Sequence, residues 1–421
     1  MAKAIPAIVT PTVLSWARQL DRFTLDEVAG KMKVPVESVQ DWENGSAYPS
    51  LKQAKDLAKL YRVPFAYFFL PSEPMGKLKR IEKVDYRTFG NIGDSFIISR
   101  ELRWLFRDVE DRRDAVLELF EMEKREPKPF QFQADQTMTS HAIAAILRDA
   151  LNLSESCQKR FRRAEVALSY CVNELEKKDV LIFQASKINP TEMRGMSAAY
   201  DVLPYIVLNR KDEYSARLFT LCHELAHIVL RSSGICNEAS EQGQSSNKME
   251  LLCNEIAGLT LVPDDMIKNH MSTQKIRLSG FDDAYVIELS RDFAVSTQVI
   301  IHRLWKTGVI TTDFYYATLK RYIEEYNLRP KKEGGFVPPA LDKGTQVGKL
   351  YTRMVLNAYR SENITVYQAS SLLLNLNSKH FDSIERWCKS CSMFLIPIFL
   401  SPFKESSQWT PIPSFGRRWG N

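Results

Sequence analysis

Residues 217–230 read RLFTLCHELAHIVL and, after a polar interval, residues 249–263 read MELLCNEIAGLTLVP. The first segment lacks Pro and Gly and is too long for a strand, so it predicts a buried helix. On that helix His223 and His227 lie four residues apart, which places both imidazoles on one face. This spacing suits one Zn²⁺ ion, with Glu224 placed to activate a water molecule.

A catalytic zinc site also needs a third protein ligand and an open coordination position. The second segment predicts a helix that Pro263 ends, with Glu250 and Asn254 on one face. Glu250 is therefore the expected third ligand, and Asn254 is expected to orient one of the ligand histidines. The alternative is that both histidines are core residues of a buried helix and bind no metal.

The two segments together resemble the ImmA/IrrE family of metallopeptidases, in which an HExxH motif and a downstream glutamate hold zinc. The resemblance runs from about residue 80 to 310, and more weakly to about 385. It departs from the family pattern at Cys222 and Cys253, where many members have Ala, and at Ile256, where Phe is usual. The other similar segments are DYRT (85–88), LEKKDVLIF (175–183), YIVLNR (205–210) and FAVSTQVIIHRL (293–304).

Composition narrows the class of protein. A chain of 421 residues with 44% hydrophobic and 26% charged residues predicts a soluble globular protein of roughly two to four modules. The net charge of +6 permits contact with nucleic acid without arguing strongly for it. Seven scattered cysteines suggest no disulfide framework, so a reducing cytoplasm is expected. The N-terminus makes a poor signal peptide, and the longest apolar run, residues 393–400, is too short for a membrane helix.

Residues 12–70 predict five short helices. Thr24 and Glu27 form a capping-box pattern at the start of the second helix, and Gly45 is placed to end the third. This layout is typical of a helix-turn-helix domain. The segments WENGSAYPS (42–50) and LAKLYRVP (57–64) resemble the Cro/repressor-like family.

In such a domain the third helix, Val36–Asn44, enters the DNA major groove. Ser38, Gln40 and Asn44 are the expected DNA contacts, and the side-chain amides of Gln40 and Asn44 suit adenine edges. The same helix carries three acidic residues and no Arg or Lys, which opposes contact with phosphate. A domain that docks a protein or dimerises is therefore the alternative to a DNA-binding one.

The whole chain predicts a mostly helical α+β fold. Three short strands are expected at Val180–Phe183, Met196–Tyr200 and Tyr205–Leu208. A sheet edge beside the zinc helix would let a peptide bind by strand addition. The first half of the chain is expected to contain a five-helix helix-turn-helix domain (1–72), then a solvated connector helix and linker (73–135). A zincin-like metallopeptidase domain (136–275) and a helical, helix-turn-helix-like subdomain (276–328) follow. The last part (329–421) is expected to consist of a linker (329–346), a small helical domain and a divergent tail.

Two further expectations concern side chains outside the zinc motif. Peptide hydrolysis needs a donor that stabilises the oxyanion, and the sequence does not choose among His270, Tyr200 and Tyr285. The helix-turn-helix-like subdomain is expected to pack against the peptidase domain rather than to bind nucleic acid. Its cationic or potentially cationic side chains are His302, Arg303 and Lys306.

The predicted function is that of a zinc-dependent endopeptidase. Its resemblance to ImmA/IrrE proteins implies a protein substrate, namely a DNA-bound repressor, antitoxin or related regulator in a mobile-element, stress or defence context. DNA is the second expected partner, through the N-terminal domain, and no membrane partner is expected. The alternative is a DNA-binding regulator or antitoxin whose peptidase-like domain binds a partner without cleaving it. The oligomeric state stays open.

Overall fold

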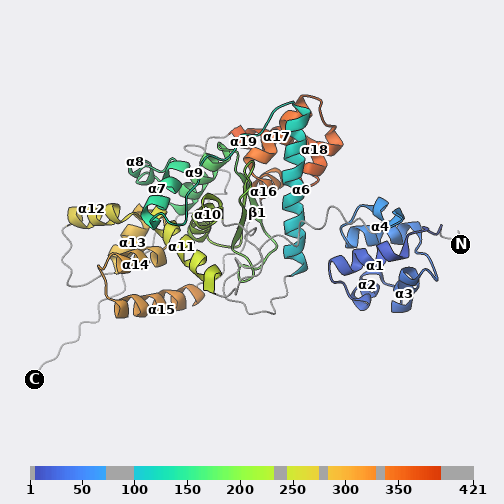
Figure 1. Ribbon diagram of the computed structural model, residues 1–421, viewed down its shortest axis with the longest axis horizontal. Coiled ribbons are helices and arrows are strands. Elements are labelled where there is room, and N and C mark those ends of the chain that lie inside the picture. Colours follow the sequence, from blue (N-terminus) through green and yellow to red (C-terminus); the bar gives the residue numbers. More distant parts are fainter. Residues whose placement is uncertain (1–4, 73–98, 232–243, 275–282, 329–336, 390–421) are drawn as a thin grey trace, which may run out of the picture.

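The computed structural model describes residues 5–72, 99–231, 244–274, 283–328 and 337–389. The fold is mostly helical α+β, as predicted, with a small sheet near the middle of the chain (Figure 1). The DYRT segment at 85–88 and the tail beyond Lys389 lie outside the described residues.

The N-terminal domain consists of five short helical elements around their own core. The predicted capping box is present, since Thr24 Oγ1 accepts from the Glu27 N–H and the Glu27 carboxylate accepts from the Thr24 N–H. Gly45 ends the third helix with a φ of 78°, a left-handed conformation that favours Gly. The elements are α1 (Pro11–Leu20), α2 (Leu25–Met32), α3 (Val36–Asn44), α4 (Leu51–Leu60) and the 3-10 helix η1 (Phe65–Phe69).

A three-stranded sheet has the order β1-β3-β2, and β2 is an edge strand. The central strand pairs in parallel with β1 and antiparallel with β2. The two faces of the sheet carry two separate cores, with Ile182 and Ile206 in one and Phe183 and Val207 in the other. All three strands lie within two residues of the predicted positions: β1 (Leu181–Ala185), β2 (Gly195–Ala198) and β3 (Tyr205–Asn209).

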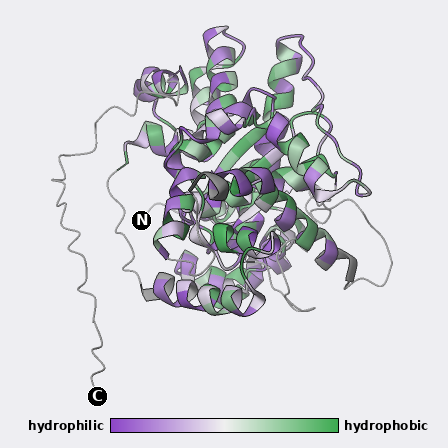
Figure 2. Ribbon diagram, turned by 90° about the vertical axis from the view of Figure 1, so that its left-hand side faces the viewer, coloured by the Kyte–Doolittle hydropathy of each residue, from purple (hydrophilic) through white to green (hydrophobic). Residues whose placement is uncertain are grey.

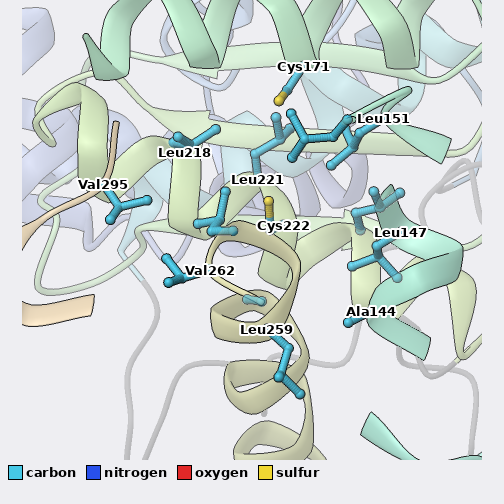
Figure 3. Close-up of a cluster of buried hydrophobic side chains, with 14 of the residues drawn as sticks. Ala144, Leu147, Leu151, Cys171, Leu218, Leu221, Cys222, Leu259, Val262 and Val295 are labelled. Carbon is cyan, nitrogen blue, oxygen red and sulfur yellow. The ribbon is translucent and has the colours of Figure 1, made fainter. Parts of the chain in front are cut away.

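The first core lies between the sheet and α10, the helix that carries the HExxH motif. Figure 3 shows side chains of α10, among them Leu221 and Cys222, together with Leu147 and Leu151 from the α7 segment. Helices packed around this core are α7 (Ser140–Ala150), α8 (Glu155–Gln158), α9 (Ala164–Glu176), α10 (Tyr214–Val229), α11 (Gln244–Leu261), α12 (Asp264–Gln274), α13 (Asp283–Asp292), α14 (Thr297–Lys306) and α15 (Thr312–Leu328).

The second core lies on the opposite face of the sheet and joins segments far apart in the sequence. Figure 1 shows α6 and α16 on the side of β1 that is away from α10. In Figure 2 the strands are largely hydrophobic, whereas many helices alternate between hydrophilic and hydrophobic residues. The helices of this core are α6 (Arg100–Met122), α16 (Pro339–Val347), α17 (Lys349–Arg360), α18 (Val366–Leu372), the 3-10 helix η4 (Ser378–His380) and α19 (Phe381–Lys389).

Two sequence expectations about these helices are wrong. The connector helix α6 is not simply solvated, because it buries eight residues, including the charged Glu110 and Arg113. The Glu110 carboxylate accepts from the Tyr205 hydroxyl at 2.7 Å, so its burial is compensated by a hydrogen bond. The expected linker 329–346 contains most of α16, whose Ala340 packs in the second core.

The N-terminal domain contacts α6 at several points, one of which is Asp21, a side chain that is 1% exposed. The Asp21 carboxylate accepts hydrogen bonds from Trp104 Nε1 at 2.7 Å and from Arg107 Nη2 at 2.8 Å. Beside it the Arg100 guanidinium lies 3.6 Å from the centroid of the Phe23 ring. These contacts join the helix-turn-helix domain to the helix that covers the sheet. Over the described residues, every helix is too short or too polar to cross a membrane.

Candidate metal centre

Helix α10 places the two motif histidines against one another. Their ring centroids are 4.8 Å apart and their Nε2 atoms 3.1 Å apart. His227 is 1% exposed and His223 is half-buried, so both rings are largely removed from water. The apolar side of the helix, with Leu218, Leu221 and Leu225, packs in the first core and sets the direction in which the histidines point.

Packing of α11 against α10 brings Glu250 to the two histidines. Glu250 Oε2 lies 3.2 Å from His223 Nε2, and Oε1 lies 3.3 Å from His227 Nε2. The predicted trio of His223, His227 and Glu250 is therefore assembled in the folded chain.

The geometry of this cluster fits a metal ion. Ligand atoms at about 2.0–2.1 Å from a tetrahedral zinc ion are about 3.3–3.4 Å apart. Here the two Nε2 atoms are 3.1 Å apart, and each has one oxygen of the Glu250 carboxylate at 3.2 or 3.3 Å. Two imidazole nitrogens and a carboxylate are also a donor set that zinc accepts. Burial raises the pKa of Glu250, but hydrogen bonds with His223 and His227 outweigh it and lower the pKa to about 2. Glu250 is thus held as a carboxylate, the form that binds a metal.

Electrostatics at His223 show the same acidic surroundings. Burial lowers the pKa of His223, but its hydrogen bond with Glu250 and the charges of Glu224 and Glu250 outweigh burial and raise it. Asn254, one turn after Glu250 on α11, adds to this rise. The buried Nδ1 atom of His223 has no hydrogen-bond partner among the described residues. The orienting role of Asn254 therefore stays a prediction.

Glu224 lies beside the cluster, 4% exposed, on the side of α10 that faces β2. Its Oε2 atom accepts a hydrogen bond of 2.7 Å from the Ser197 hydroxyl. Ser197 was not singled out from the sequence. The available signal was its place in a strand expected beside the zinc helix, which does not reveal which helix residue a serine contacts.

Comparison with known families matches residues 176–305 to the peptidase M78 model described as an IrrE N-terminal-like domain. The chain carries an IrrE N-terminal-like domain. This IrrE-like domain contains β1, β2, β3, α10 and α11, and with them all three residues of the cluster. Residues 14–68 match a helix-turn-helix family model, which confirms the second resemblance. A comparison with curated proteins found no match.

The three candidate oxyanion donors have hydrogen-bond partners outside the cluster. The Tyr200 hydroxyl donates to Glu110 of α6, and Tyr200 packs on the sheet face opposite α10. His270 lies 3.3 Å from the Tyr285 hydroxyl and 3.0 Å from Asp292 Oδ2. His270, Glu288 and Asp292 form a second, more exposed group of metal-ligating types, in which Arg162 already pairs with Asp292 at 2.6 Å.

In α14, which lies in the expected helix-turn-helix-like subdomain (276–328), Lys306 is exposed, but Arg303 and His302 offer little positive charge to a ligand. The Arg303 side chain is buried, donating to the Val262 carbonyl at 3.2 Å and pairing with Asp264. Burial, with the neighbouring Lys306 and Arg303 charges, lowers the pKa of His302 to about 4, so its ring is neutral at pH 7. These observations favour packing over nucleic-acid binding for α14.

In the N-terminal domain, the expected DNA contacts lie on α3. Gln40 and Asn44 are exposed and Ser38 is half-buried. Glu43, which seemed to oppose phosphate, is paired with Arg18 through bonds of 2.7 and 2.9 Å. This pairing neutralises one of the three acidic side chains of the helix. The electrostatic repulsion between α3 and DNA phosphates is therefore weaker than the sequence alone suggests.

Proposed function

We propose that the chain is a zinc-dependent endopeptidase of the IrrE type that cleaves a DNA-bound transcriptional regulator. One observation carries the proposal: His223 and His227 lie with their Nε2 atoms 3.1 Å apart and a Glu250 oxygen within 3.3 Å of each, next to the buried carboxylate of Glu224. A cluster that served only to bind metal structurally would not need an adjacent general base.

The roles of the residues follow from their chemistry. His223, His227 and Glu250 would hold zinc, which supplies a Lewis acid that activates water and polarises the scissile carbonyl. Glu224 takes a proton from the attacking water as general base and gives it to the leaving amine as general acid. Asn254 is proposed to help orient a ligand histidine.

The edge strand β2 supports a protein substrate. On one side β2 pairs with β3, and over the described residues its other side pairs with no strand. An extended peptide could add to that side and so lie next to Glu224, which β2 contacts through Ser197. The N-terminal domain would bring the peptidase to the operator where the substrate regulator is bound. The free, buried thiols among the described cysteines suit a reducing cytoplasm.

Elemental analysis of the purified full chain tests the metal site. We expect about one zinc per chain, lost in His223→Ala. His141→Ala is the matched control, because His141 is exposed and contacts Asp264 rather than the cluster; it should keep the zinc. If the wild-type protein is folded but contains no zinc, the three residues are part of the core and do not form a metal site.

Glu224→Gln separates the peptidase from a regulator that only binds its partner. The variant should keep zinc and fold, while cleavage of the cognate regulator falls by at least ~1,000-fold, since the general base is lost. If Glu224→Gln retains every cellular effect of the wild type, the regulator or antitoxin interpretation holds instead.

A further inference from the structure

The edge strand β2 presents alternate residues to the metal-site helix. Met196 packs in the second core, on the face away from α10. Its neighbours Gly195 and Ser197 lie on the opposite face of the strand, towards α10, as the two-residue period of a strand requires. β2 therefore touches α10 through one glycine and one serine.

Gly195 allows the backbone of β2 to approach α10 closely. A Cβ atom at Gly195 would lie 2.3 Å from Thr220 Cγ2 and 3.0 Å from Glu224 Oε1, so only Gly fits without displacement. Thr220 and Glu224 are one turn apart on α10 and both are buried. At this point the strand backbone lies directly against the helix face that carries the general base.

Because β2 lies this close to α10, the Ser197 hydroxyl can form a hydrogen bond with the general base, Glu224. The hydroxyl donates to Glu224 Oε2 at 2.7 Å, while Oε1 of the same carboxylate lies against Gly195. A glutamate side chain has three rotatable bonds, and the helix alone does not fix where its carboxylate points. A hydrogen bond to a charged acceptor, in a site shielded from water, selects one of those orientations.

We propose that Ser197 is a positioning residue that keeps the Glu224 carboxylate directed at the reacting water, with Gly195 providing the clearance. The inference rests on the proposed peptidase function and extends it to a residue outside the HExxH motif. The hydrogen bond described for the Ser197 hydroxyl goes to Glu224 and not to any of the three proposed metal ligands, so Ser197 acts through Glu224. Because β2 is also the proposed substrate edge, the same strand sets the position of the base and of the peptide.

Binding of acetohydroxamic acid to the zinc-loaded full chain tests this role without a known substrate. The hydroxamate chelates an open zinc ion and donates a hydrogen bond to an adjacent carboxylate, so its affinity reports where Glu224 points. Ser197→Ala should weaken binding about tenfold, the effect of one well-placed charged hydrogen bond. Ser197→Thr keeps the hydroxyl and should restore affinity, and zinc content should be equal in all three proteins.

A thermodynamic cycle with Glu224→Gln assigns the effect to the right residue. Ser197→Ala should add no further loss of hydroxamate affinity in the Glu224→Gln background, because the group it positions is gone. Equal affinity in wild type and Ser197→Ala would overturn the positioning role while leaving the zinc site intact. Zinc-loaded wild type that binds no hydroxamate would instead refute the open catalytic site.

Thermal unfolding of the metal-free full chain gives a second, independent measure of the contact. The destabilising effects of Ser197→Ala and Glu224→Gln should be non-additive, since the two residues share one hydrogen bond. Strictly additive shifts in Tm would show that Ser197 does not hold Glu224, whatever the hydroxamate result.

Discussion

At the residue scale, Glu176 at the end of α9 is a buried carboxyl outside the metal site. It is 2% exposed, and its Oε1 accepts from the backbone N–H of Leu350 at 3.0 Å, near the start of α17. Burial raises the pKa of Glu176 to about 7, although hydrogen bonds from Leu350 and Lys349 and the charge of Arg353 act in the opposite direction. This carboxyl connects the IrrE-like domain to the C-terminal helices.

A raised folded-state pKa makes stability depend on pH in a defined direction. The stability linked to protonated Glu176 is fully present below the unfolded pKa, near 4.5, and is lost as pH rises through about 7. Glu176→Gln keeps an acceptor for the Leu350 N–H and carries no charge, so it should stabilise the protein at pH 8 by on the order of 1–3 kcal/mol. At pH 4 the variant should gain nothing.

Denaturant unfolding of wild type and Glu176→Gln at both pH values measures this difference. Glu385→Gln is a control of the same chemistry on the surface of α19, and it should lack the gain at pH 8. A loss of stability in Glu176→Gln that is larger at pH 8 than at pH 4 would contradict this prediction and mean that the carboxyl is charged and favourable in the folded protein.

At the element scale, the contact between β2 and α10 depends on the absence of a side chain. Gly195→Ala puts a Cβ atom 2.3 Å from Thr220 Cγ2, so strand and helix must separate. We expect a destabilisation of about 1–3 kcal/mol, typical of overpacking, measured as a fall in Tm. Gly30→Ala is the matched control, because nothing lies within 4 Å of its new Cβ and alanine favours a helix by roughly 0.5–1 kcal/mol. If Gly195→Ala has the same Tm as the wild type, β2 and α10 can move apart at no cost in stability, and the prediction is wrong.

Helix α3 is the element on which sequence-specific DNA binding is expected to depend. Gln40→Ala combined with Asn44→Ala should weaken binding to DNA that the wild type selects from a random pool by at least ~10-fold, since each amide pair with adenine contributes about 1–3 kcal/mol. Glu37→Ala, at an exposed position of the same helix, should strengthen binding to any DNA by removing a negative charge. Unchanged affinity in the double variant would favour the docking or dimerisation role.

At the scale of the whole molecule, α6 connects the helix-turn-helix domain to the sheet. One end of the connection is Asp21 with Trp104 and Arg107, and the other is Glu110, which accepts from Tyr200 and Tyr205 beside the sheet. Asp21 is one of several contacts, the Arg100–Glu27 and Arg62–Asp108 ion pairs among them, that orient the helix-turn-helix domain relative to α6 and the sheet.

Asp21→Ala should weaken the docking of the helix-turn-helix domain on α6 without unfolding the domain, because the domain has its own core. The change leaves Trp104 Nε1 and the Arg107 guanidinium without their carboxylate acceptor, a loss of about 1–3 kcal/mol. Small-angle scattering should show a larger radius of gyration, with unchanged helix content by circular dichroism. Asp26→Ala, an exposed acid on α2, should leave the radius unchanged, and an unchanged radius in Asp21→Ala would refute the docking.

The sequence by itself determined the features that depend on neighbours along the chain. The spacing of His223 and His227, the capping box of Thr24 and the end of α3 at Gly45 all follow from helix periodicity or local hydrogen bonds. The three short strands and the helix-turn-helix layout were predictable for the same reason, because each element's pattern repeats within a few residues.

Only the tertiary structure decided which elements meet. It brought Glu250 to the histidines at 3.2 and 3.3 Å, placed the Ser197 hydroxyl on Glu224, and directed Tyr200 to Glu110 rather than to the metal site. It also buried charged residues of α6 that read as solvated in the sequence. Side-chain contacts between elements depend on how helices and strands pack, and a residue's immediate neighbours in the chain carry almost no information about that packing.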